Sequence, residues 1–309
     1  MSNQLLLSLC IPTNGVVEWV FPVLESIYAQ NIDENLFEVI VSDNGNNLEF
    51  EHKMTEYAKE HSNIVYKKTN AYEFLSEPEA YKLASGKLIK FINHRTKLLP
   101  NTLSYLINFV KDNENKEQKP IIYFSNGVLN NKEVRTYCTF SDFVSALGIY
   151  SSWSTGMTIW KEHFDKLSKS TKYNVLFPHT TILFNERQQN QYIVDDTILL
   201  DEMPQGKKPK GSYDLFYAFA VEYPSILLDL VKDKDLTVDA FLKIKKDILT
   251  FCSSLAVNYF IFRMYCSYDL NSFNKSMRVF FCKNDIIFMM FKIFVQKITK
   301  FILKSLTKK

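Results

Sequence analysis

The sequence has 309 residues, of which 46% are hydrophobic and 15% aromatic, so it can bury a sizeable core, and its 8 glycines and 9 prolines argue against disorder or a repeat array. The net charge of +3 comes from the last 18 residues, which hold six lysines and no acid; the other 31 basic and 34 acidic residues do not indicate a nucleic-acid-binding protein. The five scattered cysteines form no CxxC pair and fit a reducing cytoplasm, and we find neither the features of a signal peptide nor an apolar run long enough for a transmembrane helix.

Short apolar runs alternate with helical patterns along the first 127 residues. The expected strands are 5–11, 37–43, 63–68, 87–93 and 120–127, and the expected helices are 18–30, 48–60, 76–85 and 98–111. Pro12 ends the first strand, and Pro22 is expected in the first helical turn, where proline is tolerated. This alternation predicts a parallel α/β sheet, in which ligands bind at the carboxyl ends of the strands.

The pattern is less regular after residue 140. We expect a strand at 154–160 and a loop leading into a helix at 177–188, and the chain reads as mostly helical after residue 210. The stretch "DEMPQGKKPKGS" (201–212) has the composition of a linker. We therefore expect one domain at 1–205 and a second, mainly helical region at 206–309.

Three stretches of the N-terminal part resemble a known enzyme family. "LSLCIPTNGVVEWVFPVLESIYAQ", "FEVIVSDNGNN" and "ASGKLIKFINHRTKLLPNTL" are similar to bacterial family 2 glycosyltransferases of the GT-A fold, in particular to the abequosyltransferase-like branch. The resemblance covers residues 5–200. It implies a Rossmann-like, mostly parallel sheet flanked by helices, followed here by a helical C-terminal region. It also implies an inverting, hexosyltransferase-type enzyme that uses a nucleotide-sugar donor, with a UDP-sugar as the first expectation.

The resemblance assigns the nucleotide to the ends of the first two strands. Pro12 and Thr13 would line the base pocket, with Asn14 beside them, and Asp43 would accept a hydrogen bond from the base or ribose, with Asn44 next to it. The alternative is that Asp43 is only a turn residue, because Asp and Asn are favoured in "DNG" turns for local reasons.

The next family motif is an acidic run that holds Mg²⁺ or Mn²⁺ against the diphosphate, since hard cations need oxygen ligands. Aligned on "LLP", its positions fall on His94, Arg95 and Thr96, so the acidic motif is missing. No cofactor is therefore expected outright, and Mg²⁺ or Mn²⁺ is kept as an alternative. Arg95, His94 and Lys97, together with Asn93, are instead expected to contact the diphosphate and sugar. A solvated loop and an enzyme that has lost activity are the alternatives.

Transfer also needs a general base for the acceptor hydroxyl. His179 in "FPH" falls closest to the family's base position, and histidine accepts protons near neutral pH. Glu186 is the second candidate, and Trp153 is expected to stack on the acceptor, although core packing is an equal alternative. Asp195 and Asp196 read as a surface turn.

The C-terminal segment 285–309 has the pattern of a basic amphipathic helix. Its polar positions are Lys292, Gln296, Lys297, Lys300, Lys304 and Lys308, and its apolar positions include Phe291, Phe294, Val295, Ile298, Phe301 and Ile302. Such a helix is typical of peripheral membrane binding, while packing on its own domain or an oligomer contact are the alternatives.

We therefore expect a cytoplasmic enzyme, peripheral on the inner face of the cell membrane. The resemblance implies that it transfers a sugar to an oligosaccharide or lipid-linked acceptor in capsule or O-antigen synthesis. The competing interpretation is a catalytically inactive GT-A-like binding or scaffold subunit of a polysaccharide assembly complex. A nucleotidyltransferase is less well supported, because no Gly- and Arg-rich loop follows the first strand.

Overall fold

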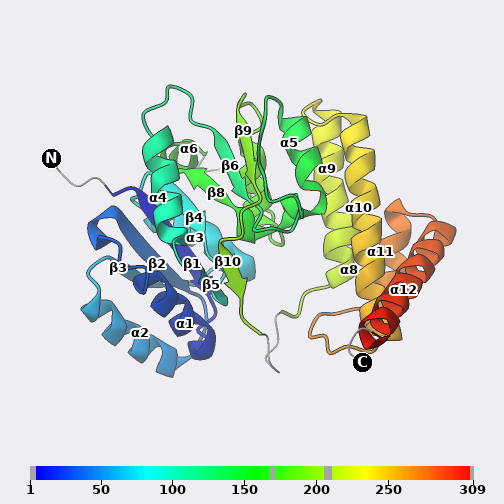
Figure 1. The fold of residues 1–309 in the computed structure, drawn as a ribbon, viewed down its shortest axis with the longest axis horizontal. Coiled ribbons are helices and arrows are strands. Elements are labelled where there is room, and N and C mark those ends of the chain that lie inside the picture. Colours follow the sequence, from blue (N-terminus) through cyan, green and yellow to red (C-terminus); the bar gives the residue numbers. More distant parts are fainter. Residues whose placement is uncertain (1–4, 168–170, 205–210, 307–309) are drawn as a thin grey trace. The chain divides into compact units, whose positions relative to one another are not determined.

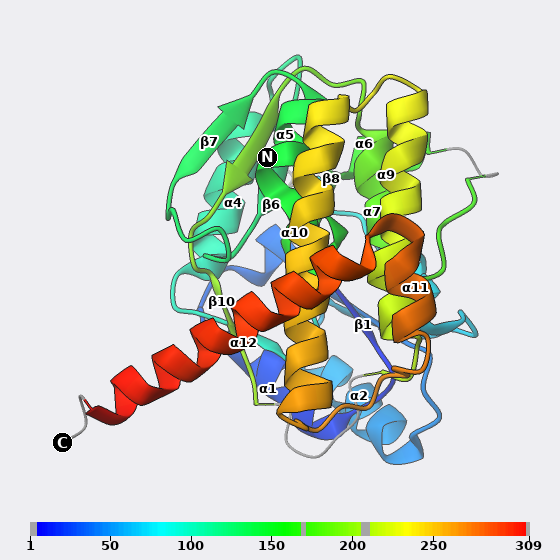
Figure 2. The ribbon, with the colours of Figure 1, turned by 90° about the vertical axis from the view of Figure 1, so that its right-hand side faces the viewer.

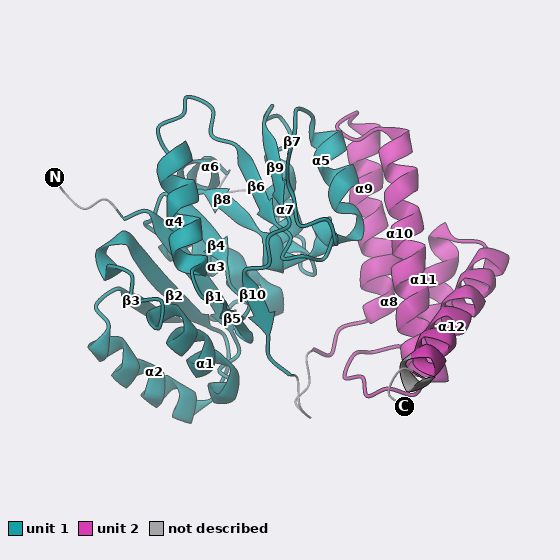
Figure 3. Ribbon diagram, in the orientation of Figure 1, with its two compact units in different colours: residues 1–204 teal, residues 205–309 magenta. Residues whose placement is uncertain are grey.

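The computed structural model describes residues 5–167, 171–204 and 211–306. The chain forms two compact units, residues 1–204 and 205–309, shown in different colours in Figure 3.

A five-stranded sheet forms the centre of unit 1. Its strands are β1 (Leu7–Thr13), β2 (Phe37–Asp43), β3 (Ile64–Lys68), β4 (Leu88–Phe91) and β8 (Thr158–Trp160). They lie in the order β3-β2-β1-β4-β8, and every pair is parallel except β4 with β8. The hydrophobic residues of β1 are fully buried because the sheet is flanked by helices (Figure 1), which explains why β1 reads as a continuous apolar run.

Helices follow the first strands as the sequence predicts. They are α1 (Val17–Tyr28), α2 (Leu48–Glu60), α3 (Ser76–Leu83) and α4 (Thr102–Asn113), with 3₁₀ turns at Glu34–Leu36 and Glu73–Leu75. Two local expectations were wrong. Pro12 lies inside β1, and Pro22 is the sixth residue of α1, beyond the first turn, where proline has no N–H to donate to the helix.

Two smaller sheets complete unit 1. A strand β5 (Thr96–Leu98), where the sequence predicted the approach to a helix, pairs antiparallel with β10 (Leu200–Glu202). The expected strand at 120–127 is β6 (Ile121–Phe124), which lies outside the main sheet and pairs with β9 (Tyr192–Asp195), itself next to β7 (Val134–Tyr137).

Short helices connect these strands. They are α5 (Phe140–Leu147), α6 (Lys161–Lys166) and α7 (Pro178–Asn185), with 3₁₀ turns at Gly148–Ser152 and Ser154–Gly156.

Unit 2 is helical over its described residues. It contains α8 (Leu215–Tyr217), α9 (Tyr223–Lys232), α10 (Val238–Ala256), α11 (Phe273–Phe280) and α12 (Lys283–Leu306), with π-helical turns at Ala218–Glu222 and Val257–Ile261. None of the described helices is long and apolar enough to cross a membrane.

The expectation of a surface turn at Asp195 and Asp196 was wrong, because both residues are buried. The Asp196 carboxylate accepts hydrogen bonds from the Ser125 hydroxyl and from the backbone N–H groups of 129, 131 and 132. Burial raises the pKa of Asp196, but these hydrogen bonds outweigh that effect and lower the pKa below its ordinary value. Asp196 therefore holds the loop 129–132 against the end of β9.

Replacing Asp196 with Asn should lower the free energy of unfolding by about 3 kcal/mol, because an amide turns a donor toward backbone N–H groups that need an acceptor. Urea unfolding at pH 7 measures this effect, with Asp112→Asn at an exposed position of α4 as the control. Because folding lowers the pKa of Asp196, the difference from wild type should shrink as the pH falls below about 4. A difference that persists unchanged at low pH would contradict this account.

Candidate functional site

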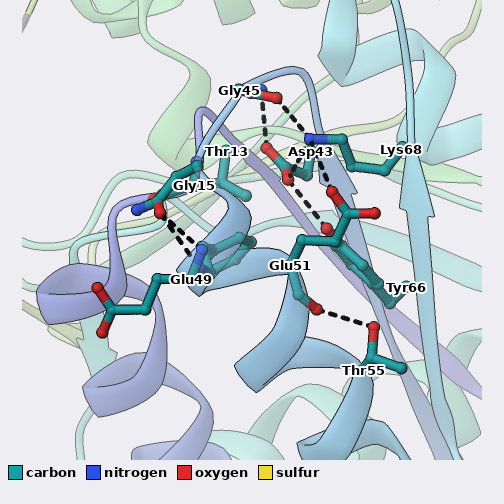
Figure 4. A network of polar contacts seen from close by, with 11 residues as sticks. Thr13, Gly15, Asp43, Gly45, Glu49, Glu51, Thr55, Tyr66 and Lys68 are labelled. Atoms are coloured by element: carbon teal, nitrogen blue, oxygen red, sulfur yellow. Dashed lines mark hydrogen bonds and ion pairs between the residues drawn. The ribbon is translucent and has the colours of Figure 1, made fainter.

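The carboxyl ends of β1 and β2 meet around the buried Asp43. Thr13 and Asp43 lie opposite each other at the ends of the two strands. One Asp43 oxygen accepts from the Gly45 N–H at 2.7 Å, and the other accepts from the Tyr66 hydroxyl and the Lys68 ammonium, each at 3.0 Å (Figure 4). Asp43 has no exposed surface, so its carboxylate organises this edge of the sheet and does not face solvent.

The two loops at this edge approach each other closely. The Asn44 N–H donates to the Thr13 carbonyl at 3.0 Å, and the Asn44 amide donates to the carbonyls of Ala71 and Glu73. A Cβ atom at position 45 would lie only 2.0 Å from the Asn14 carbonyl oxygen, so a residue larger than glycine does not fit there without a shift of the backbone. Asn14 itself is exposed. The predicted nucleotide-binding residues are therefore brought together at one edge.

The loop 93–97, which we call the basic corner, contacts the same edge of the sheet through His94. The Thr13 hydroxyl accepts from the Gly15 N–H and lies 2.9 Å from His94 Nδ1, and the imidazole also contacts the Trp19 ring. Burial, and secondarily the charge of Arg95, lowers the pKa of His94 to about 4. His94 is thus neutral at physiological pH, and the expectation that it adds positive charge to the corner is not supported by this geometry.

Arg95 is the cation that this corner holds in place. Its Nη2 lies 2.8 Å from Oε1 of Glu202, and its backbone carbonyl accepts from the Met203 N–H. Nη1 is buried and has no hydrogen-bond partner among the described residues. A buried guanidinium nitrogen without an acceptor costs about 1–3 kcal/mol, so this atom marks a place where an anionic oxygen would be stabilised.

The remaining corner residues have different surroundings. The Asn93 side chain accepts from the Arg95 N–H, which shapes the turn between β4 and β5. Lys97 is partly exposed on β5, opposite Asp201 of β10.

The residues of the corner do not fit a divalent cation. Among the residues that the structure describes, no three His, Cys, Asp or Glu side chains lie together in an arrangement that could hold a metal. Of the two acids that β10 places opposite β5, Glu202 is paired with Arg95 and Asp201 lies opposite Lys97, and cationic side chains beside these carboxylates oppose cation binding.

Three buried side chains hold the segment 150–157, which includes Trp153. The Tyr123 hydroxyl donates to the carbonyls of Tyr150 and Trp153 at 2.6 and 2.7 Å. The Lys90 ammonium donates to the Thr155 carbonyl at 2.5 Å. His179 Nε2 donates to the Ser152 carbonyl at 2.7 Å. Trp153 is half-buried and packs edge-on against Tyr150, which fits the core-packing alternative, and its contact with an acceptor stays a prediction.

The two predicted bases are both buried. His179 Nδ1 lies 3.5 Å from Glu77, whose other oxygen accepts from the Tyr81 hydroxyl. Glu186 lies 2.7 Å from His163 Nδ1. His179 therefore touches the segment that carries Trp153, whereas Glu186 is joined to α6.

Sequence reasoning missed Glu202, Glu77 and Lys90. Lys90 did leave a signal, because a lysine in the middle of the apolar run "KLIKFIN" must find partners when the strand is buried. Glu202 left none, since its role depends on the pairing of β5 with β10.

No protein-family model matches the sequence, and no curated protein matches it in a sequence comparison. Solved structures do resemble it. The *S. aureus* TarS fragment 1–349 in complex with UDP-GlcNAc has a TM-score of 0.60 at 14% identity, over 93% of this chain and 82% of that one. The mannosyltransferase PcManGT from Pyrobaculum calidifontis, in complex with GDP-Man and Mn²⁺, has a TM-score of 0.53 at 11% identity, over 94% and 87%.

The chain shares the fold of these proteins. This confirms the expected α/β fold of GT-A type with a helical C-terminal region. Against the longer *S. aureus* TarS structure, with a TM-score of 0.53 at 12% identity, the match covers 83% of this chain but only 44% of that one.

Lys90 predicts a pH dependence of stability. Burial lowers its pKa to about 7, an effect that Glu77 partly opposes. Above pH 7 the unfolded chain binds the proton that the folded protein has lost, so this residue makes stability rise with pH. We expect the free energy of unfolding of wild type, relative to Lys90→Met, to increase by about 2 kcal/mol from pH 7 to pH 9. Urea unfolding of both proteins tests this, and a constant difference would contradict it.

Proposed function

We propose that unit 1 binds a nucleoside diphosphate sugar at the carboxyl edge of its sheet and transfers the sugar to an acceptor hydroxyl. The observation that carries the proposal is Arg95 Nη1, which has no acceptor among the described residues and lies at the edge where loops 12–15, 43–45 and 93–97 meet. Support comes from the fold, because two proteins that share it were solved with UDP-GlcNAc and GDP-Man.

Arg95 is the residue that would stabilise the leaving diphosphate. A guanidinium can contact two phosphate oxygens at once, and negative charge develops on those oxygens as the glycosidic bond breaks. Lys97 would add a second, more mobile charge, and neutral His94 a hydrogen bond. Because the corner does not fit a divalent cation, we propose that transfer proceeds without a metal.

The proposed reaction is a single displacement with inversion. The acceptor oxygen forms a bond to the anomeric carbon while the bond from that carbon to the diphosphate breaks, and the acceptor proton passes to a base. His179 is the proposed base: Nε2 donates to the Ser152 carbonyl, so Nδ1, which lies 3.5 Å from Glu77, is the ring nitrogen that would take the acceptor's proton. Trp153, next to Ser152, would contact the acceptor or the sugar.

The finer assignment follows the sequence resemblance. We propose a family 2, hexosyltransferase-type enzyme that uses a UDP-sugar and a lipid-linked oligosaccharide acceptor in the synthesis of a bacterial surface polysaccharide. We place it in the cytoplasm, at the inner face of the membrane.

A second candidate function is nucleotide-sugar binding without transfer. The burial of both His179 and Glu186 favours it, because a base must reach the acceptor hydroxyl. The pairing of Arg95 with Glu202 also favours it, because the carboxylate already offsets part of the charge that would stabilise the leaving diphosphate. Measuring binding and transfer separately distinguishes the two functions.

Replacing Arg95 with Ala should weaken UDP binding about tenfold or more, because charge-assisted hydrogen bonds contribute roughly 1.5–3 kcal/mol. Calorimetric titration in excess EDTA measures this. The matched control is Arg135→Ala, since this exposed arginine of β7 also pairs with a glutamate, Glu133, as Arg95 pairs with Glu202. Unchanged affinity in Arg95→Ala, or binding that requires Mn²⁺, would refute the assignment.

The variant His179→Gln separates a base from a positioning residue. A glutamine amide can still donate to the Ser152 carbonyl but cannot accept the acceptor's proton. If His179 is the base, kcat should fall about 100-fold or more with little change in KM, and the fall in rate at acidic pH should disappear. Radiolabelled transfer from a nucleotide-sugar panel to membrane lipids gives the measurement. Near wild-type kcat in His179→Gln, with loss only in His179→Ala, would make the residue structural.

A further inference from the structure

Unit 2 exposes apolar side chains along one side of α12. Five of its exposed apolar residues, with exposed fractions from 37% to 66%, form what we call the apolar face: Phe288, Phe291, Val295, Ile298 and Ile302. Ile287, Phe301 and Leu303 are exposed on the same helix. The residues of the apolar face follow steps of three and four residues, so they lie on the same side of the helix. Contiguous exposed patches of large apolar side chains mark interaction surfaces in soluble proteins.

The apolar face is distinct from the side of α12 that packs within unit 2. Ile286 and Ile293, seven residues apart, are both 6% exposed. Helix α12 contacts α10, and Figure 2 shows it crossing α10 and continuing past it. Because α12 already has a packed side, its own unit does not explain the second one.

A neighbouring segment extends the exposed apolar surface. Ile261, Phe262, Met264 and Tyr265 follow α10 and are 41% to 62% exposed. The Phe262 ring stacks on Phe294 of α12, with 5.9 Å between the ring centroids, so the segment lies beside the helix. The exposed aromatic and apolar groups therefore come from two parts of the chain.

Charge identifies what covers this surface. Residues 259–309 contain ten lysines and arginines and two aspartates, while the rest of the chain carries 27 basic and 32 acidic residues. Arg263, Lys292 and Lys300, on the same two parts of the chain as the apolar groups, are exposed. Two copies meeting through the same face would bring these cations together, whereas anionic lipid headgroups would neutralise them.

We propose that the apolar face and the segment 261–265 dock together on an anionic lipid surface. Helix α12 lies in the plane of the interface with Phe288, Phe291 and Ile298 in the acyl boundary, and its lysines reach the headgroups. Phe262, Met264 and Tyr265 of the segment 261–265 form a second anchor, which does not belong to the helical pattern of α12. The proposal does not rest on sugar transfer.

Flotation of the full chain with vesicles tests the proposal. We compare phosphatidylcholine vesicles with vesicles that contain about 30% phosphatidylglycerol, and we expect binding to the anionic vesicles only, weakened by high salt. The variant Phe288→Ser/Phe291→Ser should lose at least tenfold in partitioning, and Met264→Ser/Tyr265→Ser should lose a comparable amount by itself. Leu48→Ser, at a 79% exposed position of α2, is the matched control.

Circular dichroism and melting temperature show whether each variant is folded, which is expected because all the substituted side chains are exposed. Failure to bind anionic vesicles, or equal binding to neutral ones, overturns the proposal. If wild type does not bind vesicles but is a dimer in light scattering, and Phe288→Ser/Phe291→Ser is a monomer, the apolar face binds a second copy of the chain and the proposal is overturned. Full binding by Met264→Ser/Tyr265→Ser overturns the second anchor. UDP titration of the same variants should match wild type, so this test fails or succeeds independently of the proposed function.

Discussion

The pairing of β1 with both β2 and β4 is the constraint on which the candidate site depends. Parallel strands end at the same edge of a sheet, so this order brings together three loops that are distant in sequence. Thr13 is the point of contact, since its backbone binds Asn44 and its hydroxyl meets His94. A slip of one residue in either pairing would turn these side chains to the opposite face.

The charge at this edge is organised by long-range partners. His94 is held neutral by burial, and the guanidinium of Arg95 is oriented by Glu202, which arrives on β10 at the end of unit 1. A carboxylate on one side of a guanidinium fixes its plane and leaves donors on the other side. The corner therefore presents an arginine that Glu202 orients, and such a guanidinium favours an anion over a cation.

The segment 150–157 shows why buried ionisable groups are retained in this fold. Two consecutive 3₁₀ turns form most of this segment, and Tyr123, His179 and Lys90 each donate to one or more of its carbonyl groups. Burying Lys90 is unfavourable because its ammonium loses hydration, and the hydrogen bonds to backbone offset part of that cost. The result is a segment whose position depends on three separate elements.

The sequence by itself determined the alternation of strands and helices, the loops after β1 and β2, and the amphipathic composition of α12, because these are local patterns of apolar side chains and turn residues. It placed Asp43 and Arg95 at the strand ends where the structure has them. Only the tertiary structure decided the partners. β5 and β10 have three residues each, too few to show a period, and their pairing joins segments about a hundred residues apart. The Glu202 contact, the hydrogen-bond partners of Lys90, the burial of Asp196 and the packing of α12 on α10 all depend on contacts distant in sequence, which local pattern cannot specify.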